Sequence, residues 1–454
     1  MNQRNGKKST AHDMTQGPIL SQLVFFSLPL ILGNIFQMLY NTVDSVIVGN
    51  FVGKHALAAV GSTTVIVGMI VFFFSGFAIG AGVVIGNNFG AKNMERLHDA
   101  IHTTIAAAFI LSFLLTALGV AAVKPMLTLM RTPKDVFQDA ALYLRIYLGG
   151  ISGLLIYNMG SGILRAVGDS IRPLGFLILT SILNTLLDLL FVLVLKTGIA
   201  GAAIATILSQ FVSAALILML LTRSKDIYRL NWKELHIDVS ILKRIFAIGM
   251  PAALQTTITS LSNVFVQGYI NFFGADVMAG WSCFNKLDYF VYLPMQSMSM
   301  AATTFVSQNI GAGNERRSRR GTLLSIMITL LVTGVIAVVF IIFAPQAVRL
   351  FSPDAEVIRF GAMFVRANVF FLLFNGVAQV LAGSLRGRGD SRGPMIIMLF
   401  SFVLVRQIYL FWVTHWVANT PLLVGLGYPV GWVCCCVVEV FYAWYRSRRR
   451  VTVV

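Results

Sequence analysis

The amino-acid sequence predicts an all-α polytopic membrane protein, with twelve transmembrane helices in two parallel six-helix repeats. Composition is the first reason: 57% of the 454 residues are hydrophobic and only 12% are charged, whereas soluble domains carry about 25% charged residues. Twelve long apolar stretches and an internal repeat are the other two. This composition excludes an ordinary soluble domain, and it also excludes intrinsic disorder.

The apolar stretches are long enough to be membrane-spanning helices, which need about 20 mostly apolar residues each. No small-residue cleavage site follows the first stretch, so we expect no removable signal peptide. The twelve spans are predicted at residues 19–49, 56–86, 99–123, 140–164, 173–196, 199–222, 241–272, 277–306, 321–344, 356–385, 393–416 and 421–445.

The distribution of Lys and Arg predicts the orientation of these spans, because cytoplasmic loops are enriched in basic residues. With the N-terminus inside, the inside segments hold 24 Lys and Arg, the outside loops hold 7, and four lie within spans. This topology also explains the net charge of +17 without a nucleic-acid partner. We therefore expect a multi-pass protein of the plasma (inner) membrane with both termini in the cytoplasm.

Three loops recur at a constant offset of 221 residues, which indicates an internal duplication. Residues 164–173 match 385–394 at six of ten positions, 88–93 match 309–314 at four of six, and 50–53 match 271–274 at three of four. Six spans per repeat is an even number, so both halves cross the membrane in the same sense. The predicted domains are a cytoplasmic tail (1–18), an N-lobe (19–222), a cytoplasmic linker (223–240), a C-lobe (241–445) and a basic cytoplasmic tail (446–454).

The repeated Gly-Asp-Ser turns, at 168–170 and 389–391, each precede a predicted helix. Glycine supplies a positive φ and Asp or Ser caps the new helix. We interpret these turns, and the Asn-x-Gly-Ala-x-Asn loops, as structural. Arg165 and Arg386 beside the turns are interpreted as topology anchors at the inner surface rather than as gates.

Enzyme motifs are missing from the sequence. It has no Walker A pattern, dinucleotide fingerprint or His-Glu-x-x-His motif, so ATP hydrolysis and zinc proteolysis lack their parts. His98 and His102 share a helix face near the inner end of the third span, but without a nearby acidic third ligand we interpret them as interfacial rather than metal-bound. We expect no enzyme activity, no cofactor and no resident metal.

Fourteen of the 18 acidic residues lie in the tail, loops or helix ends, and four lie within predicted spans: Asp44, Asp188, Asp288 and Glu439. A carboxylate at mid-bilayer costs roughly 2.5–3.5 kcal/mol, so each one is a functional hypothesis. Asp44 and Asp188 both belong to the first six spans, and for this pair we favour function over separate structural roles. The polar residues predicted to accompany them are Gln37, Asn41, Asn158, Asn184 and Thr206.

The acids of the second half are interpreted differently. Asp288 lies two residues from Lys286, so a charge pair is available to it, and structural pairing and ion coupling remain equal alternatives. Glu439 lies near the inner end of the last span, where solvent access is easy, and we interpret it as an anchor. Gln255 and Asn375 complete a possible C-lobe cavity with Asp288.

Two carboxylates in a cavity of low dielectric do not both ionise readily, which raises the affinity of one for a proton. Oxygens of Asn184 and Thr206 beside Asp44 and Asp188 would also allow Na⁺ in place of H⁺. A cationic substrate is attracted to the same acidic cavity. Competition between ion and substrate is therefore a sufficient basis for antiport.

Several motifs together resemble the multidrug and toxic compound extrusion (MATE) transporters, over about residues 15–445. They are the first-span Pro29…Gln37…Asn41-Thr42-Val43-Asp44, the duplicated Leu-Arg-x-x-Gly-Asp turns, and Asn184-x-x-x-Asp188. The resemblance implies a V-shaped pair of six-helix lobes in the lipid bilayer and cation-driven export of amphipathic, often cationic small molecules. It also implies a cation site carried over onto Asp44, Asn184, Asp188 and Thr206, and less directly onto Gln37 and Asn158. We expect a monomer.

The second half departs from the NorM-type branch of that family. Its seventh span has no acid, and Asn375 stands in the tenth span where that branch has Asp. The sequence therefore resembles the branch without an acidic C-lobe cation site, which favours H⁺ over Na⁺ as the coupling ion.

Two other function classes are alternatives. A lipid-linked precursor flippase of the related superfamily would favour a basic cavity, to which Lys286, Arg366 and Arg406 point, whereas twelve spans and an acidic N-lobe weigh against it. An integral membrane enzyme, such as a lipid-modifying transferase, would need a clustered Asp-rich motif, which the sequence lacks.

Overall fold

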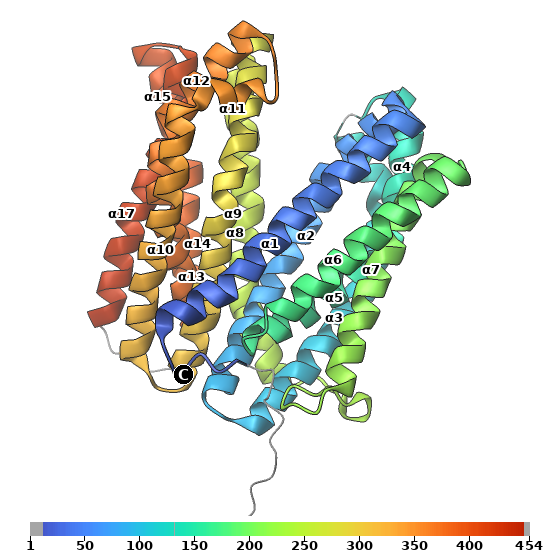
Figure 1. The fold of residues 1–454 in the computed structure, drawn as a ribbon, viewed down its shortest axis with the longest axis vertical. Coiled ribbons are helices and arrows are strands. Elements are labelled where there is room, and N and C mark those ends of the chain that lie inside the picture. The colour runs from blue at the N-terminus through green and yellow to red at the C-terminus, as the bar shows by residue number, and fades with distance from the viewer. Residues whose placement is uncertain (1–11, 131, 449–454) are drawn as a thin grey trace, which may run out of the picture. The chain divides into compact units, whose positions relative to one another are not determined.

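The fold of the protein, a computed structural model, is described for residues 12–130 and 132–448 (Figure 1). Within these ranges every regular element is a helix and no strand occurs. Residues 1–11, 131 and 449–454 lie outside the described residues, and they include most of the two predicted cytoplasmic tails.

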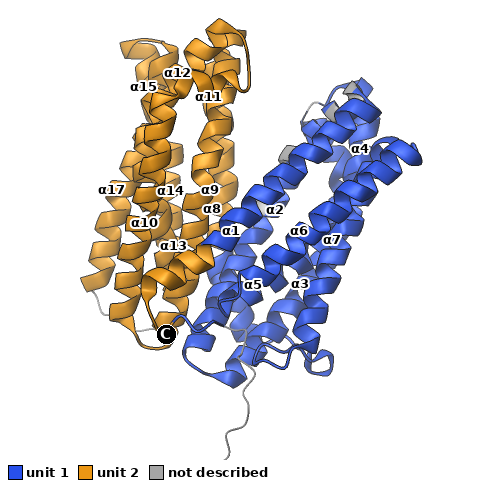
Figure 2. Cartoon of the chain, in the orientation of Figure 1, with its two compact units in different colours: residues 1–14, 28–250 blue, residues 15–27, 251–454 orange. Residues whose placement is uncertain are grey.

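The described chain forms two compact units, shown in different colours in Figure 2: unit 1 (12–14 and 28–250) and unit 2 (15–27 and 251–448). The first helix of each repeat is divided between them. Helix α1 (Ile19–Ile47) begins in unit 2, and α8 (Val239–Asn271) begins in unit 1. Pro29 and Pro251 lie within two residues of these divisions, where a proline removes one helical hydrogen bond and allows a bend.

Unit 1 contains most of the first repeat. Its helices after α1 are η1 (Val48–Val52), α2 (Lys54–Gly90), α3 (Met94–Leu129), α4 (Lys134–Gly149), α5 (Ile151–Ala166), α6 (Ile171–Asp188), η2 (Leu189–Val194), α7 (Gly198–Arg223) and η3 (Trp232–Glu234). Helix α2 packs against α3, α4 and α5, while α7 packs against α4, α5 and α6. Two apolar clusters fill the spaces between these helices.

Unit 2 contains most of the second repeat. Its helices after α8 are α9 (Ala275–Gly311), α10 (Glu315–Ile342), α11 (Ala344–Arg349), α12 (Ala355–Asn368), η4 (Val369–Phe371), α13 (Leu372–Gly387), α14 (Arg392–Leu399), η5 (Phe400–Val405), α15 (Arg406–Trp412), η6 (Val413–Val417), α16 (Pro421–Gly425) and α17 (Gly427–Arg448). Helix α9 packs against α10, α12 and α13. Its Trp281 makes ring contacts with Phe364 and Tyr428 at the centre of the core.

The internal repeat is expressed in the backbone as well as in the sequence. Helices α2 and α9 are both 37 residues long, and each begins and ends 221 positions from its counterpart. The same offset of 221 relates pairs of residues that have a positive φ, a conformation that residues other than glycine rarely adopt. These pairs are Gly53 and Gly274 (115° and 91°), Lys92 and Gly313 (55° and 72°), and Gly168 and Gly389 (89° and 86°).

Most of these helices can span a membrane. Ten in the described chain are long and apolar enough to do so, and the bent pair α4 and α5, which meet at 46°, makes an eleventh. The eighth predicted span lies in α9, which is 37 residues long and carries the charged residues Asp276, Lys286 and Asp288. Each predicted stretch therefore coincides with a helix or a broken helix.

The predicted capping role of the repeated turns is confirmed. Asp169 Oδ1 accepts the N–H groups of Ile171 (3.2 Å) and Arg172 (3.1 Å) at the start of α6, and Asp390 Oδ1 accepts that of Gly393 (3.1 Å) in α14. The interpretation of Arg386 as a topology anchor stays a prediction. The residue is 7% exposed inside unit 2, because the last turn of α13 packs against α9.

Candidate functional site

Asp44 and Asp188 lie together in unit 1. Asp44 belongs to the last turn of α1 and Asp188 is the final residue of α6. A side-chain hydrogen bond joins the two carboxyl groups, and Asp188 is only 1% exposed. Two carboxyl groups approach this closely only when a proton or another cation lies between them. The pair is therefore suited to hold a single positive charge.

Each acid lies where an α-helix changes into a π-helix. Asp44 is followed by η1, and Asp188 is followed directly by η2. A π-helical turn interrupts the regular hydrogen-bond ladder, and such turns are frequent at functional sites. The two π-helical segments also contact each other. The backbone around the pair is thus less regular than the helices that position it.

Asn184 and Thr206 complete the predicted polar group around Asp188. With the Asn184 amide oriented to satisfy its neighbours, its nitrogen lies 3.0 Å from Asp188 Oδ2 and its oxygen lies 3.2 Å from the backbone nitrogen of Thr206. Thr206 Oγ1 donates to the carbonyl of Ala202 in its own helix (3.0 Å). Helices α6 and α7 are in this way connected beside the carboxyl pair.

Tyrosines that the sequence analysis did not single out surround the same pair. Tyr40, one turn before Asp44 on α1, interacts with Thr206 through a side-chain hydrogen bond. Tyr143 and Tyr147 of α4 stack at 6.2 Å between ring centroids and lie within electrostatic reach of Asp44. Their i, i+4 spacing in an apolar helix was the only signal in the sequence, and it is shared by many packed aromatic pairs.

The remaining predicted residues have no hydrogen bond to the pair within the described chain. Gln37 and Asn41 are exposed on α1, on the helix face that their spacing shares with Asp44. The Asn158 amide donates to the carbonyl of Leu154 within α5 (2.9 Å). These residues are separate from the hydrogen-bonded group.

The carboxyl pair has no basic partner in the described part of the chain. Each acid interacts with the other acid and with neutral side chains. Asp44 Oδ1 and Asp188 Oδ1 are buried and have no hydrogen-bond donor among the described residues. Oxygen atoms of this kind are suited to a proton or to a hard cation such as Na⁺.

The possible C-lobe cavity does not form a comparable cluster. Gln255 Oε1 accepts Arg386 Nη1 (3.3 Å), Asn375 is buried on α13, and Asp288 lies half-buried on α9. No hydrogen bond joins these three predicted residues within the described ranges. In the described part of unit 2, no second carboxyl is therefore hydrogen-bonded to Asp288.

One alternative left open for Asp288 is not formed, and the expected solvent access of Glu439 is wrong. Lys286 does not pair with Asp288, because residues two apart point to opposite sides of a helix; its Nζ lies 5.2 Å from the centroid of the Phe351 ring instead. Glu439 is not open to solvent, since its side chain is 0% exposed. It lies within electrostatic reach of Arg386, so it belongs to the interior of unit 2.

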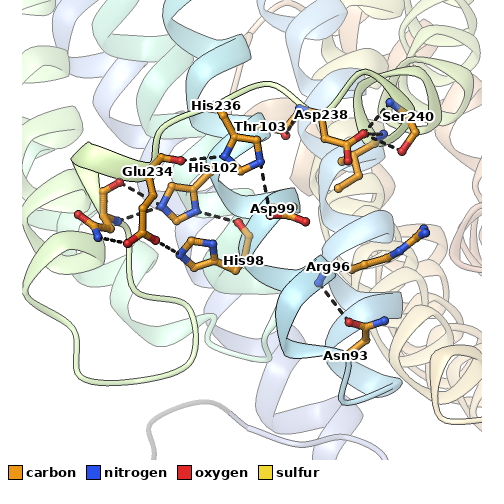
Figure 3. Close-up of polar contacts among 12 residues, drawn as sticks. Asn93, Arg96, His98, Asp99, His102, Thr103, Glu234, His236, Asp238 and Ser240 are labelled. Carbon is orange, nitrogen blue, oxygen red and sulfur yellow. Dashed lines mark hydrogen bonds and ion pairs between the residues drawn. The ribbon is translucent and has the colours of Figure 1, made fainter.

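The expectation that no acid lies near His98 and His102 is also wrong. Glu234, which is 136 positions after His98, places Oε2 3.0 Å from His98 Nε2. Figure 3 shows the two imidazoles on α3 facing this carboxylate on η3. The distance along the chain concealed this contact, which joins the linker after α7 to α3.

Comparisons with known proteins agree with this arrangement. The MatE family model matches residues 29–190 and 248–412. The chain is 31% identical to the probable multidrug resistance protein YpnP of Bacillus subtilis over 92% of this chain and 93% of that protein. It is 28% identical to the probable multidrug resistance protein YoeA of the same organism, over 94% of each chain.

Among solved structures, a crystal structure of MATE in the bent conformation has the same fold. It matches with a TM-score of 0.91 at 24% identity, over 97% of this chain and 98% of that one. This match confirms the predicted fold class, an all-α membrane protein built from two six-helix repeats. The chain belongs to the MatE family, whose members are membrane transporters and not enzymes.

Proposed function

We propose that this protein is a secondary active antiporter that exports amphipathic, cationic compounds in exchange for H⁺ bound at Asp44 and Asp188. The observation that carries the proposal is the buried carboxyl pair, which has no basic partner among the described residues. Relatives named as multidrug resistance proteins support the substrate class. Na⁺ is the alternative coupling ion, since the two carboxyl groups offer oxygen ligands to a cation.

Exchange follows from competition for one negative charge. When the pair holds a proton, it attracts a cationic substrate weakly; when the proton leaves, the charge that remains attracts the substrate. A transporter that changes its access while holding either one, but not both, moves them in opposite directions. Asn184 contributes a neutral hydrogen bond that orients Asp188.

The available energy is sufficient for useful export. One pH unit is worth about 1.4 kcal/mol, which is a tenfold concentration ratio. Moving one positive charge outward against 100 mV costs about 2.3 kcal/mol, and inward movement of one H⁺ offsets that amount. One-for-one exchange of a monovalent cation is therefore driven by the pH gradient alone.

We also propose that both termini face the cytoplasm of a plasma (inner) membrane. The support is the excess of Lys and Arg in the segments predicted to lie inside.

The test is export of a cationic dye from proteoliposomes, with pH and Na⁺ gradients imposed separately. We expect the wild-type protein to follow the pH gradient, and Asp44→Asn to lose gradient-driven export while inserting normally, because an amide cannot release a proton. Asp288→Asn is the matched control, since it removes another intramembrane acid that has no carboxyl partner among the described residues. Undiminished export by Asp44→Asn would refute the proposal. Export driven by the Na⁺ gradient alone would show that the coupling ion is Na⁺ and not H⁺.

A further inference from the structure

A second group of ionisable side chains lies in unit 1, at the end of α3 that is predicted to face the cytoplasm. His98 and His102 are one helical turn apart on α3, and Glu234 comes from η3 in the linker between α7 and α8. The ligand atoms of the three residues all lie within 4.8 Å of one another. Two imidazoles at i, i+4 and a carboxylate are a donor set that binds divalent transition metals.

We propose that His98, His102 and Glu234 form a binding site for a divalent transition metal of the Zn²⁺ class, which joins the linker to α3. This role is separate from the transport function proposed for Asp44 and Asp188. Donor atoms that share a tetrahedral ion at about 2.0–2.1 Å lie about 3.3 Å apart. The three atoms therefore need to move closer by at most about 1.5 Å, which side-chain rotation supplies.

The hydrogen bonds of His102 give it the form of a metal ligand. Its Nδ1 lies 2.8 Å from the carbonyl oxygen of His98, to which it donates. Its Nε2 accepts the backbone N–H of Asn231 (3.0 Å), so the Nε2 lone pair faces the linker, and a metal ion would take the place of this hydrogen bond. An imidazole that donates through one nitrogen to a carbonyl and offers the other as a ligand is the usual arrangement at metal sites.

The contact between His98 and Glu234 supplies the other two ligands. His98 Nε2 and Glu234 Oε2 are 3.0 Å apart, and a hydrogen on Nε2 lies between them. A metal ion that binds both atoms takes the place of this hydrogen, which moves to Nδ1 of the neutral imidazole. Glu234 Oε1 is already held by the Asn231 amide, which orients the carboxylate for a ligand on its Oε2 side.

Neighbouring contacts hold the linker in register with α3 without supplying ligands. His236 Nδ1 is bonded to the carbonyl of Glu234 (2.8 Å) and its Nε2 lies 3.4 Å from Asp99 Oδ1. The backbone N–H of Asp238 donates to Thr103 Oγ1 (3.0 Å). Figure 3 shows these contacts side by side along α3. The two segments are therefore already in place for the metal.

Two imidazoles and one carboxylate favour Zn²⁺, Co²⁺ or Ni²⁺ over Mg²⁺ and Ca²⁺, which prefer oxygen ligands. Three protein ligands leave a fourth position for water. The side chains of His98 and Glu234 are 35% and 54% exposed, so an ion reaches the site from solvent without opening the unit.

The test is Co²⁺ and Zn²⁺ titration of the full-length protein in detergent after removal of any His-tag. We expect one Co²⁺ per chain with the visible absorption of a tetrahedral site and no thiolate charge-transfer band. His98→Ala and Glu234→Gln should each weaken binding at least tenfold. Both side chains are partly exposed, so these variants are expected to fold, as size-exclusion elution will show.

A control separates this site from other histidines. His415→Ala removes an exposed imidazole at η6 in unit 2 and should bind one Co²⁺ as the wild type does. Absence of binding to the wild type, or equal affinity in His98→Ala and Glu234→Gln, would overturn the proposal and leave a metal-free hydrogen-bonded contact. A thiolate band would overturn it as well, because it would assign the metal to cysteines.

Discussion

The two units have similar backbones and different charged interiors. Unit 1 brings Asp44 and Asp188 together among neutral side chains, whereas unit 2 buries Arg406, 3% exposed, against Asn263 and Ser262. At the repeat offset of 221, the position of Asp188 is occupied by Tyr409, whose hydroxyl donates to the carbonyl of Leu423 (2.9 Å).

The comparison of the two units separates the backbone features that they share from the charged side chains that differ between them. The shared positive-φ turns and the equal bounds of α2 and α9 maintain the fold of each unit. The acid pair was retained, or acquired, in one unit only. An arginine that is bonded to neutral side chains keeps its charge and orders its neighbours, whereas a carboxyl pair changes its charge when a proton leaves. Ion coupling is therefore expected in unit 1.

The largest effect should appear in substrate-induced proton release. When a cationic dye binds to wild-type protein in weakly buffered detergent, we expect about one proton per chain to be released, because dye and proton compete for the pair. Asp188→Asn should release none. The released protons are measured with a pH indicator dye whose absorption does not overlap that of the cationic dye.

Arg406→Gln in unit 2 is the contrasting variant for this measurement. It should keep the release of one proton even if its folded yield falls, because Arg406 has no part in the acid pair. Loss of proton release in Arg406→Gln at normal dye affinity would show that the charges of the two units act together, and the comparison would fail.

A smaller effect should distinguish two glycines at equivalent positions. A Cβ at Gly383 would lie 2.4 Å from the carbonyl oxygen of Ser299, whereas a Cβ at Gly162 would lie 3.2 Å from that of Ala78. Overpacking of this kind costs about 1–3 kcal/mol. We expect Gly383→Ala to lower the thermal unfolding midpoint in detergent clearly and Gly162→Ala to lower it little. Equal midpoints would mean that the α9–α13 contact relaxes freely.

Local signals were sufficient to predict the helices, the turns and one part of the site. The apolar stretches and the cost of a charge in lipid depend on nearby residues alone, which is why the positions of the spans and the importance of Asp44 and Asp188 followed from the sequence. The spacing of Asn184 and Asp188 by one helical turn likewise predicted their contact.

The errors came from contacts between distant segments and from the rotation of helices. Nothing local indicates that Glu234 reaches His98, or that Tyr143 lies near Asp44. The position of a residue along a helix does not determine whether its side chain faces the interior. Glu439 is buried although it lies near the end of α17. The opposite directions of Lys286 and Asp288 were predictable from helix geometry.

The smallest effect concerns the two capping aspartates. Asp390 Oδ2 also accepts Tyr442 (2.6 Å) and Arg446 Nε (3.0 Å), and these contacts are weakened in Asp390→Asn, at a cost of about 1 kcal/mol. Asp169→Asn keeps an oxygen for the cap, so its free energy of unfolding should change by about 0.5 kcal/mol or less. Thermal unfolding in detergent measures both, and a larger loss in Asp169→Asn would contradict this order.

The pH dependence of the Asp169 variant gives an independent check. Burial raises the pKa of Asp169 above its ordinary value of 3.8, while the N–H groups and charge of Arg172 oppose that change. A carboxyl with a higher pKa in the folded state favours folding while protonated, and this stability is lost as the pH rises from 3.8 through the folded-state pKa. Asparagine does not titrate, so the stability of wild type relative to Asp169→Asn should decline over that interval. A difference that is constant with pH would show that Asp169 ionises as readily in the folded protein as in the unfolded chain.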